Sequence, residues 1–450
     1  MSDVRSDAGT DIEPVAMPRV DDTPPEEAAS LAQRWYVAFM MCLVYTLSIS
    51  DRYSISTVLE PIRRQLHLSD ANVAFLTGVS LALFYVFFGF PLSWLIDRYS
   101  RRNIIGASLI AWSALTTATG VARSYGQLLW ARIGVGVGEA GGTPGANSLL
   151  SDYFPAARRP MALQIFALGA PVGAWVGSQV AGDLAYRFGW RTMFLLLGIP
   201  GAIVGALIFL TIREPRRGRL DAQPHATAPP FLDTVRFLWS QRSAVHLMVA
   251  GAITALWGWG LMWWTPAFLM RSYSLNVAQA GSILGPVHLI GGSAAMIGST
   301  WLLSRPAFAD PRRIVRWLGV YIAFATVVTA VIYSTSSLAL TRWLFWLYIP
   351  ALYIYIGSSF GILNNLAQPK MRAMYCTITL FIANVCNLIV APQAVGFLSD
   401  WFAPHGQPTA MSLRLAMLCL VPTGFWASWH FFRSARGLLE DERRARSIAR

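Results

Sequence analysis

The stretch Arg132–Phe154, RIGVGVGEAGGTPGANSLLSDYF, decides the fold class. It consists mainly of glycine and small or apolar residues, yet its first eight positions include one arginine and one glutamate. An α-helix needs about 20 predominantly apolar residues to cross the ~30 Å hydrocarbon core of a bilayer. We therefore predict a membrane-spanning helix over residues 126–150, and the two charges within it need a physical explanation.

The whole chain has the composition of a membrane protein. Of its 450 residues, 55% are hydrophobic and 13% are charged, whereas soluble domains carry roughly 25% charged residues. Apolar runs of spanning length recur along the sequence, and a helix satisfies its own backbone hydrogen bonds in lipid. We expect an all-α membrane protein with about twelve transmembrane helices. The predicted spans are 34–60, 70–95, 103–122, 126–150, 160–184, 190–212, 243–270, 276–303, 314–336, 340–365, 373–399 and 409–432.

The positive charges follow the loops rather than one face. The formal net charge is +13, which could suggest nucleic acid. However, 26 of the 36 lysines and arginines lie in the N-terminal arm, the loops after even-numbered spans and the C-terminal tail, and 8 lie in the opposite loops. The positive-inside rule then places both termini in the cytoplasm, and we expect the protein in a cell (inner) membrane. We expect no nucleic-acid partner, and we expect the basic tail, 433–450, to touch anionic membrane lipid.

The sequence gives no clear indication of a disulfide, a metal site or a signal peptide. Cys42, Cys376, Cys386 and Cys419 fall inside predicted spans without a close-spaced pair, so we expect no disulfide, no metal site and no cofactor. Residues 1–33 lack the basic n-region and apolar h-region of a signal peptide, and they are predicted to form a disordered cytoplasmic arm.

The longest polar interruption divides the spans into six and six. It runs over 213–242 and ends in the amphipathic FLDTVRFLWSQRS. We therefore predict two six-helix halves, 34–212 and 243–432, joined by a cytoplasmic linker. The halves repeat one spacing of residues, in Pro155, Arg158 and Gly182 and again in Pro369, Arg372 and Gly396. Such duplication is typical of secondary transporters that alternate access around a site between repeats.

The loop after the second span carries a recognisable pattern. Its sequence SWLIDRYSRRN, residues 93–103, resembles the Gly-x-x-x-Asp-Arg-x-Gly-Arg-Arg signature of the major facilitator superfamily, with serine at both glycine positions. The resemblance implies a cytoplasmic gate whose charges hold the halves together when the transporter is open to the outside. An alternative is a simple positive-inside anchor. The predicted gate residues are Asp97, Arg98, Arg101, Arg102, Asp152 and Arg158.

Three further stretches narrow the resemblance. SDRYSISTVLEPIRRQLHLSD at 50–70, GVGEAGG at 136–142 and FGWRTMFLLLGIPG at 188–201 are similar to the Spinster group of that superfamily. Better-known Spinster members move lysophospholipids or sphingosine phosphate. In the first half the likeness extends to these sequence stretches, whereas in the second half it is limited to the architecture. It implies a transporter, not an enzyme, for an amphipathic anionic molecule or lysolipid.

Helical geometry places the intramembrane charges. Arg132 and Glu139 point within about 20° of each other, and Thr143 continues their stripe. Asp51 and Arg52 are adjacent and point about 100° apart. Asp51 and Arg132 both lie about 9–14 Å below the outer surface, so a pair is feasible, whereas Glu139 lies about 20 Å down, near the midplane where transporters bind substrate.

These intramembrane charges allow two interpretations. Burying a charge at a helix centre costs about 2.5–3.5 kcal/mol on insertion scales, so such a residue faces a partner or a cavity. The charges could form ion pairs that only fasten span one to span four. Alternatively, the resemblance implies that Asp51 and Glu139 are proton-linked acids and that Arg52 and Arg132 order the site or bind an anionic headgroup.

Other polar and aromatic residues are secondary candidates. We predict that Asn364 and Asn365 contribute to substrate binding, as Thr143 would beside Glu139, because a buried amide needs partners. His288 is expected to be satisfied by a neighbouring helix. The tryptophans of span seven are expected mainly to face lipid; they are Trp257, Trp259, Trp263 and Trp264.

The sequence therefore predicts a proton-coupled secondary transporter that works by alternating access, as a monomer. Nothing resembles a nucleotide-binding loop, so ATP is not the expected energy source. Alternatives remain open. The cargo could be a small soluble organic anion or a drug, or the protein could be a passive lipid pathway or a membrane lipid enzyme.

Overall fold

A computed structural model of the 450-residue chain describes residues 30–155, 157–216, 231–368 and 371–448. Within these residues the chain is helical and has no strand, and eight helices are long and apolar enough to cross a membrane. Three predicted features fall partly outside the described residues. They are the N-terminal arm at residues 1–29, the linker at residues 217–230 and the repeated spacing at Pro369.

The first six predicted spans fold as a series of helices, several of them interrupted. Gly189 reverses the chain within the last of these helices, with a φ of 81° that glycine adopts without strain. The elements are α1 (Leu31–Thr57), α2 (Leu59–Leu66), α3 (Asp70–Ala74), the π turn η1 (Phe75–Val79), α4 (Ser80–Arg98), α5 (Arg101–Val121), α6 (Tyr125–Glu139), α7 (Gly142–Tyr153), α8 (Arg159–Ala167), α9 (Gly169–Trp175), the π turn η2 (Val176–Val180) and α10 (Ala181–Thr211).

The second six spans follow a helix that matches the amphipathic part of the predicted linker. The elements are α11 (Phe231–Ser240), α12 (Arg242–Tyr273), α13 (Val277–Pro286), the π turn η3 (Val287–Gly292), α14 (Ser293–Leu303), η4 (Pro306–Phe308), α15 (Pro311–Ser334), α16 (Leu338–Leu366), α17 (Arg372–Asn384), the π turn η6 (Val385–Val390), α18 (Ala391–Trp401), η7 (Pro404–Gly406), α19 (Ala410–Leu420) and α20 (Thr423–Ile448).

Polar caps set several helix ends. The side chain of Ser124 accepts a hydrogen bond from the Gln127 amide at the start of α6. Asn276 and Gln279 form a reciprocal capping box at the start of α13. Each cap satisfies backbone N–H groups that have no partner within the helix.

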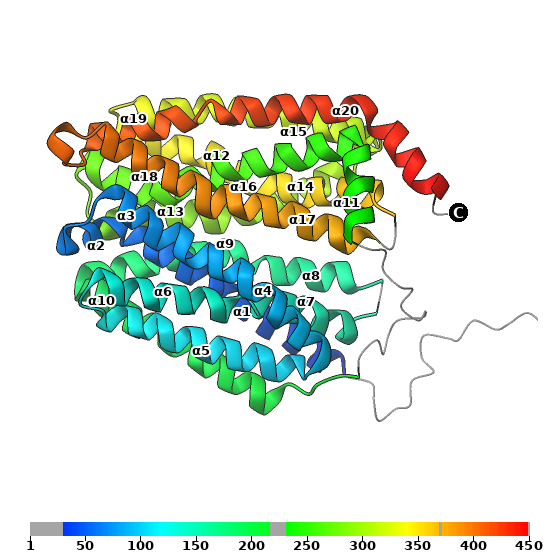
Figure 1. The fold of residues 1–450 in the computed structure, drawn as a ribbon, viewed down its shortest axis with the longest axis horizontal. Coiled ribbons are helices and arrows are strands. Elements are labelled where there is room, and N and C mark those ends of the chain that lie inside the picture. Colours follow the sequence, from blue (N-terminus) through cyan, green and yellow to red (C-terminus); the bar gives the residue numbers. More distant parts are fainter. Residues whose placement is uncertain (1–29, 156, 217–230, 369–370, 449–450) are drawn as a thin grey trace, which may run out of the picture.

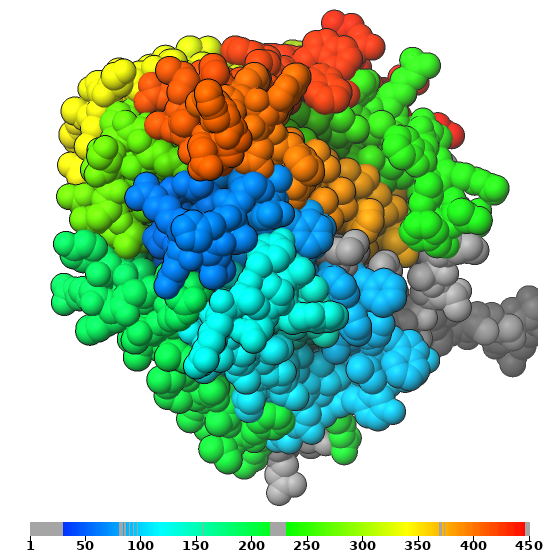
Figure 2. Space-filling view, turned by 60° about the vertical axis from the view of Figure 1, so that its left-hand side comes forward, coloured from blue at the N-terminus to red at the C-terminus, as the bar shows by residue number. Residues whose placement is uncertain are grey.

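The two halves lie as two layers of long helices (Figure 1). We call the end of the bundle that carries the α4–α5 turn, α11 and the end of α20 the basic end, and the end that carries α2, α3 and the α12–α13 turn the opposite end. At the opposite end the halves touch, because α3 packs on α18. Figure 2 shows the blue segment of α2 and α3 lying directly against the orange segment around α18.

Four spans form the seam between the halves, and in the described residues each contains a π turn, namely η1, η2, η3 and η6. Such turns are rare and often mark functional sites. Backbones touch across this seam. A Cβ on Gly78 of η1 would lie 2.2 Å from the carbonyl oxygen of Leu388 in η6, and one on Gly281 of α13 would lie 2.2 Å from that of Ser178 in η2. Only glycine permits this approach.

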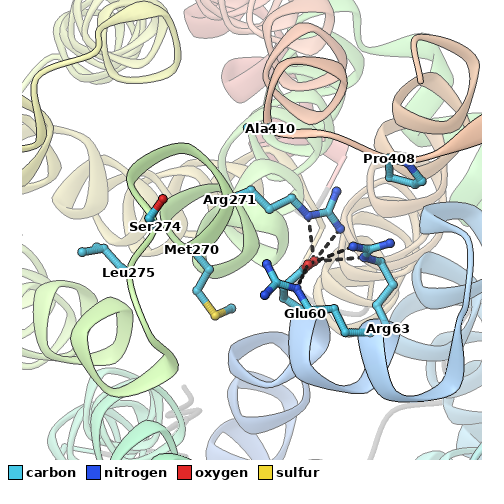
Figure 3. A pocket seen from close by; sticks show the side chains of 9 residues that line it. Glu60, Arg63, Met270, Arg271, Ser274, Leu275, Pro408 and Ala410 are labelled. Atoms are coloured by element: carbon cyan, nitrogen blue, oxygen red, sulfur yellow. Dashed lines mark hydrogen bonds and ion pairs between the residues drawn. The ribbon is translucent and has the colours of Figure 1, made fainter. Parts of the chain in front are cut away.

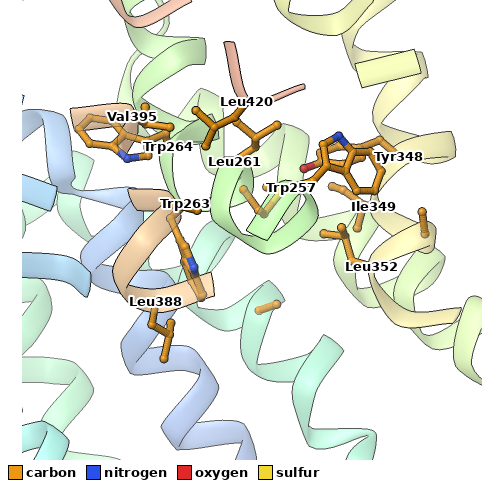
Figure 4. Packing of buried hydrophobic residues seen from close by; sticks show 14 of the residues in the cluster. Trp257, Leu261, Trp263, Trp264, Tyr348, Ile349, Leu352, Leu388, Val395 and Leu420 are labelled. Atoms are coloured by element: carbon orange, nitrogen blue, oxygen red, sulfur yellow. The ribbon is translucent and has the colours of Figure 1, made fainter. Parts of the chain in front are cut away.

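Three of the four tryptophans of α12 are buried inside the protein, so the expectation that most of them face lipid is wrong. Trp257 and Trp264 are fully buried and Trp263 is 9% exposed. Figure 4 shows them packed between helices of the second half. Their ring nitrogens explain the placement in part, because Trp263 donates to Oδ1 of Asn387 at 2.8 Å and Trp264 donates to the Pro392 carbonyl at 3.1 Å.

Candidate functional site

Four charged side chains form two crossed ion pairs between α1 and α6. Nη1 of Arg132 lies 2.7 Å from Oδ2 of Asp51, and Nη2 of Arg52 lies 2.8 Å from Oε2 of Glu139. The pairing of Asp51 with Arg132, which depth made feasible, is present. Opposite charges in contact are what the cost of burial requires.

Three successive residues of α1 face two parts of the protein, with Asp51 and Arg52 toward α6 and Tyr53 toward the second half. Asp51 faces α6 and also accepts a hydrogen bond at 2.8 Å from Oγ1 of Thr116 in α5. Arg52 turns to Glu139. Tyr53 turns to the second half, where its ring meets Trp263 and His288 at centroid distances of 5.0 Å and 4.9 Å. Residues about 100° apart on one helix thus join the ion pairs to the seam. The sequence carries no local signal for Thr116.

The two ion pairs differ in accessibility. The side chains of Asp51 and Arg132 are 5% and 0% exposed, whereas that of Arg52 is 15% exposed against 0% for Glu139. Oε2 of Glu139 accepts the Nε–H of Arg52 at 2.9 Å, and Oε1 has no hydrogen-bond partner among the described residues. The pair of Arg52 and Glu139 is therefore the more accessible of the two.

The other predicted binding residues are placed as follows. Thr143 lies in the first turn of α7 and lines a small pocket together with Glu139 and Ser48. Asn364 and Asn365 lie in the last turn of α16, where Asn364 accepts a hydrogen bond from Cys376 of α17. The structure brings Thr143, but not these asparagines, into contact with the lining of the pocket beside Glu139. Their roles remain predictions.

At the basic end the predicted gate residues cluster around Arg101. Arg101 is buried and pairs with Asp152, and its Nε donates to Glu214 at 2.8 Å. The backbone amide of Arg102 also donates to Glu214, at 2.8 Å. Burial alone would raise the pKa of Glu214, but the amide of Arg102 and the guanidinium of Arg101 hold it below its usual range.

Glu214 follows the last helix of the first half and was missed by sequence reasoning, because its partners are more than a hundred residues away. The contacts of Arg101 with Asp152 and Glu214 join elements of the first half. Arg98 stacks over Trp94 at 4.1 Å, and Arg158 is exposed at the start of α8. Asp97 lies in α4, and its side chain is outside the described part.

A second ionic cluster joins the halves at the opposite end, and the sequence did not predict it. Arg271, at the end of α12, donates from Nη1 and Nη2 to both oxygens of Asp70 at 2.7 Å and 2.6 Å. Its Nε donates to Glu60 of α2 at 2.7 Å. Figure 3 shows Arg271 and Arg63 converging on Glu60. The side chains of Arg271, Glu60 and Asp70 are 4%, 2% and 0% exposed. Buried bidentate pairs of this kind are strong and directional.

Arginines of α2 surround the same carboxylates beside a surface pocket of about 350 Å³. Arg63 and Arg64 both donate to Glu60. Burial alone would raise the pKa of Glu60, which lies beyond the end of α1, but the hydrogen bond from Arg63 and the charge of Arg271 lower it to about 2. The spacing of Glu60 three and four residues before two arginines was the available signal.

Asp400 of α18 completes this contact from the other half. Its carboxylate accepts the backbone N–H groups of Asp70 and Ala71 at 2.9 Å and 2.8 Å, and so caps α3. Ser399 donates to Asp70 at 2.6 Å. A carboxylate at a helix N-terminus is favourable both as a hydrogen-bond acceptor and as a charge.

Comparison with known proteins now decides the family. The model of the Major Facilitator Superfamily matches residues 41–375. The chain belongs to the Major Facilitator Superfamily. It is 27% identical to an MFS-type efflux pump of Mycolicibacterium smegmatis, over 92% of this chain and 96% of that protein. It is 24% identical to a probable L-galactonate transporter of Escherichia coli, over 89% and 91%.

Among solved structures, a bacterial homologue of the human lysosomal transporter Spinster, inward-facing and unoccupied, superimposes with a TM-score of 0.81. The two sequences are 28% identical, and the match covers 92% of this chain and 99% of that one. The Spinster-like resemblance is thereby confirmed. As a member of the superfamily the chain is an integral membrane transporter and not an enzyme.

Proposed function

We propose that this chain is a proton-coupled transporter of an amphipathic anionic molecule, such as a lysophospholipid, and that Arg52 and Glu139 carry the coupling. The observation that supports this proposal is that the ion pair of Arg52 and Glu139 uses only one of the two carboxylate oxygens. One oxygen of Glu139 holds Arg52, the other oxygen is unbonded among the described residues, and Arg52 is the most exposed of the four intramembrane charges.

An anion that binds Arg52 competes directly with Glu139 for the same guanidinium. Once Glu139 loses this partner it is a carboxylate in a water-poor site, and it takes up a proton rather than remain charged. Binding of the anion and binding of the proton therefore favour each other. This positive linkage is the thermodynamic basis of cotransport. The more buried pair of Asp51 and Arg132 holds α1 and α6 in register while the other pair exchanges partners.

The contacts between the halves support an orientation. The positive-inside rule places the basic end in the cytoplasm. The seal formed by Arg271, Glu60 and Asp70 then closes the external side, which agrees with the inward-facing state of the Spinster homologue. Alternating access would part this seal and bring Arg52 and Glu139 to external solvent.

The decisive experiment is uptake of labelled lysophosphatidic acid into proteoliposomes with and without an imposed pH gradient. Glu139→Gln is compared with Glu440→Gln, which removes an exposed acid in α20. We expect gradient-driven uptake to fall at least tenfold in the first variant and to stay unchanged in the second. Uptake by Glu139→Gln that still follows the gradient would reject Glu139 as the coupling group. Wild-type flux indifferent to the gradient would indicate a passive pathway.

A second candidate is transport of a small soluble organic anion or a drug. The likeness to an L-galactonate transporter and to an efflux pump supports it. In that case the same assay would show uptake of a sugar acid, or extrusion of a drug, and no competition by lysolipid. Arg52 would serve as the anion anchor for a sugar acid as it would for a lipid headgroup.

A further inference from the structure

His288 lies within the seam, in the π turn η3, and is fully buried. Its Nδ1 is 3.0 Å from the hydroxyl of Tyr353 in α16. Its ring meets that of Tyr53 from α1 edge to face. The imidazole is therefore held by one residue of each half, at a turn type that often marks a functional position.

The other ring nitrogen is unused. Nε2 of His288 has no hydrogen-bond partner among the residues that the structure describes. We assign the Tyr353 hydroxyl as the donor to Nδ1, because its own proton is then satisfied, and this choice of tautomer leaves the ring hydrogen on Nε2. A buried donor without an acceptor is unfavourable, and native proteins rarely keep one without a reason.

The surroundings define which acceptor would fit. Trp259 packs against both tyrosines, Tyr53 and Tyr353, and Trp263 packs against Tyr53, so the neighbours are aromatic. An anionic group would lack a counterion beside these rings, whereas an uncharged carbonyl oxygen needs only the Nε2–H. Tyr53, whose ring contacts that of His288, directly follows Arg52, the proposed anion anchor, in α1.

We propose that Nε2–H of His288 donates a hydrogen bond to the carbonyl oxygen of the ester or amide that joins the headgroup of the substrate to its apolar tail. This inference rests on the proposed function, since it takes Arg52 as the anchor of the headgroup. Tyr53 covers His288 from the other half, so the carbonyl reaches Nε2 when the halves shift and this ring contact opens.

The test uses two probes that differ in this carbonyl alone: 1-acyl lysophosphatidic acid and its 1-O-alkyl ether counterpart. Affinity for each is measured with the full chain in nanodiscs. We expect the wild type to bind the ester about tenfold more tightly, the range of one well-placed neutral hydrogen bond. His288→Phe keeps the ring but removes the donor, and it should erase this preference by weakening the ester alone. His288→Gln offers an amide N–H and should retain part of it.

Two controls separate this effect from misfolding. His430→Phe changes another buried histidine, which pairs with His246 between α12 and α20, and should leave the preference intact. Tyr353→Phe removes the hydroxyl that bonds Nδ1, so the ring hydrogen is no longer fixed on Nε2, and the preference should fall. This variant replaces His288→Phe in the test if His288→Phe does not fold. Equal wild-type affinity for both probes would overturn the inference and leave the proposed function standing. Binding of neither probe by folded wild type would overturn both.

Discussion

The two halves of this transporter share an architecture but differ in what they bury. The first half buries charge: Asp51, Arg132 and Glu139 are each at most 5% exposed. The second half buries neutral aromatic groups, with Trp257, Tyr348 and Tyr353 among its most enclosed side chains. In the proposed function, the first half would exchange the proton and hold the anion, and the second would contact the apolar tail.

The division also shows how duplicated halves specialise. Several buried polar groups in the second half have neutral partners, as when the Tyr348 hydroxyl donates to the Gly258 carbonyl at 2.6 Å. Charge from the second half enters the seam through Arg271 and Asp400, at the opposite end. The proposed coupling pair and the proposed external seal thus lie in different places, so variants can perturb them separately.

The largest loss of stability is expected when one member of a buried ion pair in the first half is removed. Arg132→Met leaves Asp51 buried without its cation, which should lower the free energy of unfolding by about 3–5 kcal/mol. The double change Arg132→Met with Asp51→Leu should recover most of this loss, because a buried pair replaced by apolar groups is often near neutral. Thermal unfolding in detergent measures both. Equal destabilisation of the single and double variants would show that the ion pair is not what Arg132 contributes.

The next effect concerns the seal. Arg271→Met removes the cation that the second half supplies to Glu60 and Asp70 and leaves Arg63 of their own half beside both carboxylates. It should shift the population toward the externally open state by at least tenfold. Spin labels at Arg123→Cys and Gln407→Cys, in a background without the four native cysteines, report the separation of the halves at this end. Arg64→Ala is the matched control, because Arg64 bonds the same Glu60 but is 66% exposed. It should move the distance distribution little.

The pH response should separate the seal from the coupling pair. The pKa of Glu60 is lowered from 4.5 to about 2, so its contribution to closure is fully present above about pH 4.5 and is lost only as the pH falls toward 2. We therefore expect the label distances at the opposite end to be constant between pH 8 and 5, while transport varies with pH over that range. A distance change near pH 6 would indicate that another group controls the seal.

The smallest effect is expected in the second half. Tyr348→Phe removes one neutral hydrogen bond from a buried ring and should cost about 1 kcal/mol of unfolding free energy. The dependence of uptake on the pH gradient should stay as in the wild type. A shifted pH profile in this variant would mean that the aromatic core takes part in coupling, against the division of roles described above.

Much of the architecture follows from the sequence. Apolar runs and the polar interruption predict the spans and the two halves, and a helical wheel places Arg132 and Glu139 on one face. A helical wheel cannot say which residue of a neighbouring helix each charge contacts. The crossed pairing depends on the rotation of α1 against α6, and rotation is set by packing along the whole helix rather than by any local motif.

The seal was beyond sequence reasoning for a related reason. Asp70 and Arg271 are separated by 201 positions, and each resembles an ordinary loop charge. Their contact follows from the conformational state, which composition does not encode. The tryptophans of α12 were misplaced because aromatic residues suit both the membrane interface and a protein core, and only the packing of α12 among its neighbours distinguishes these settings.

Helix α3 has five residues, and two of its backbone N–H groups are capped by Asp400 of the other half. When the halves part, this cap is lost and only Ser69 continues to accept an N–H, that of Asn72, at the start of the helix. Closure of the opposite end is therefore also a small folding reaction, in which Asp400 of one half stabilises a turn of helix in the other. Its temperature dependence should carry the signature of ordering a segment, and not only that of two rigid bodies meeting.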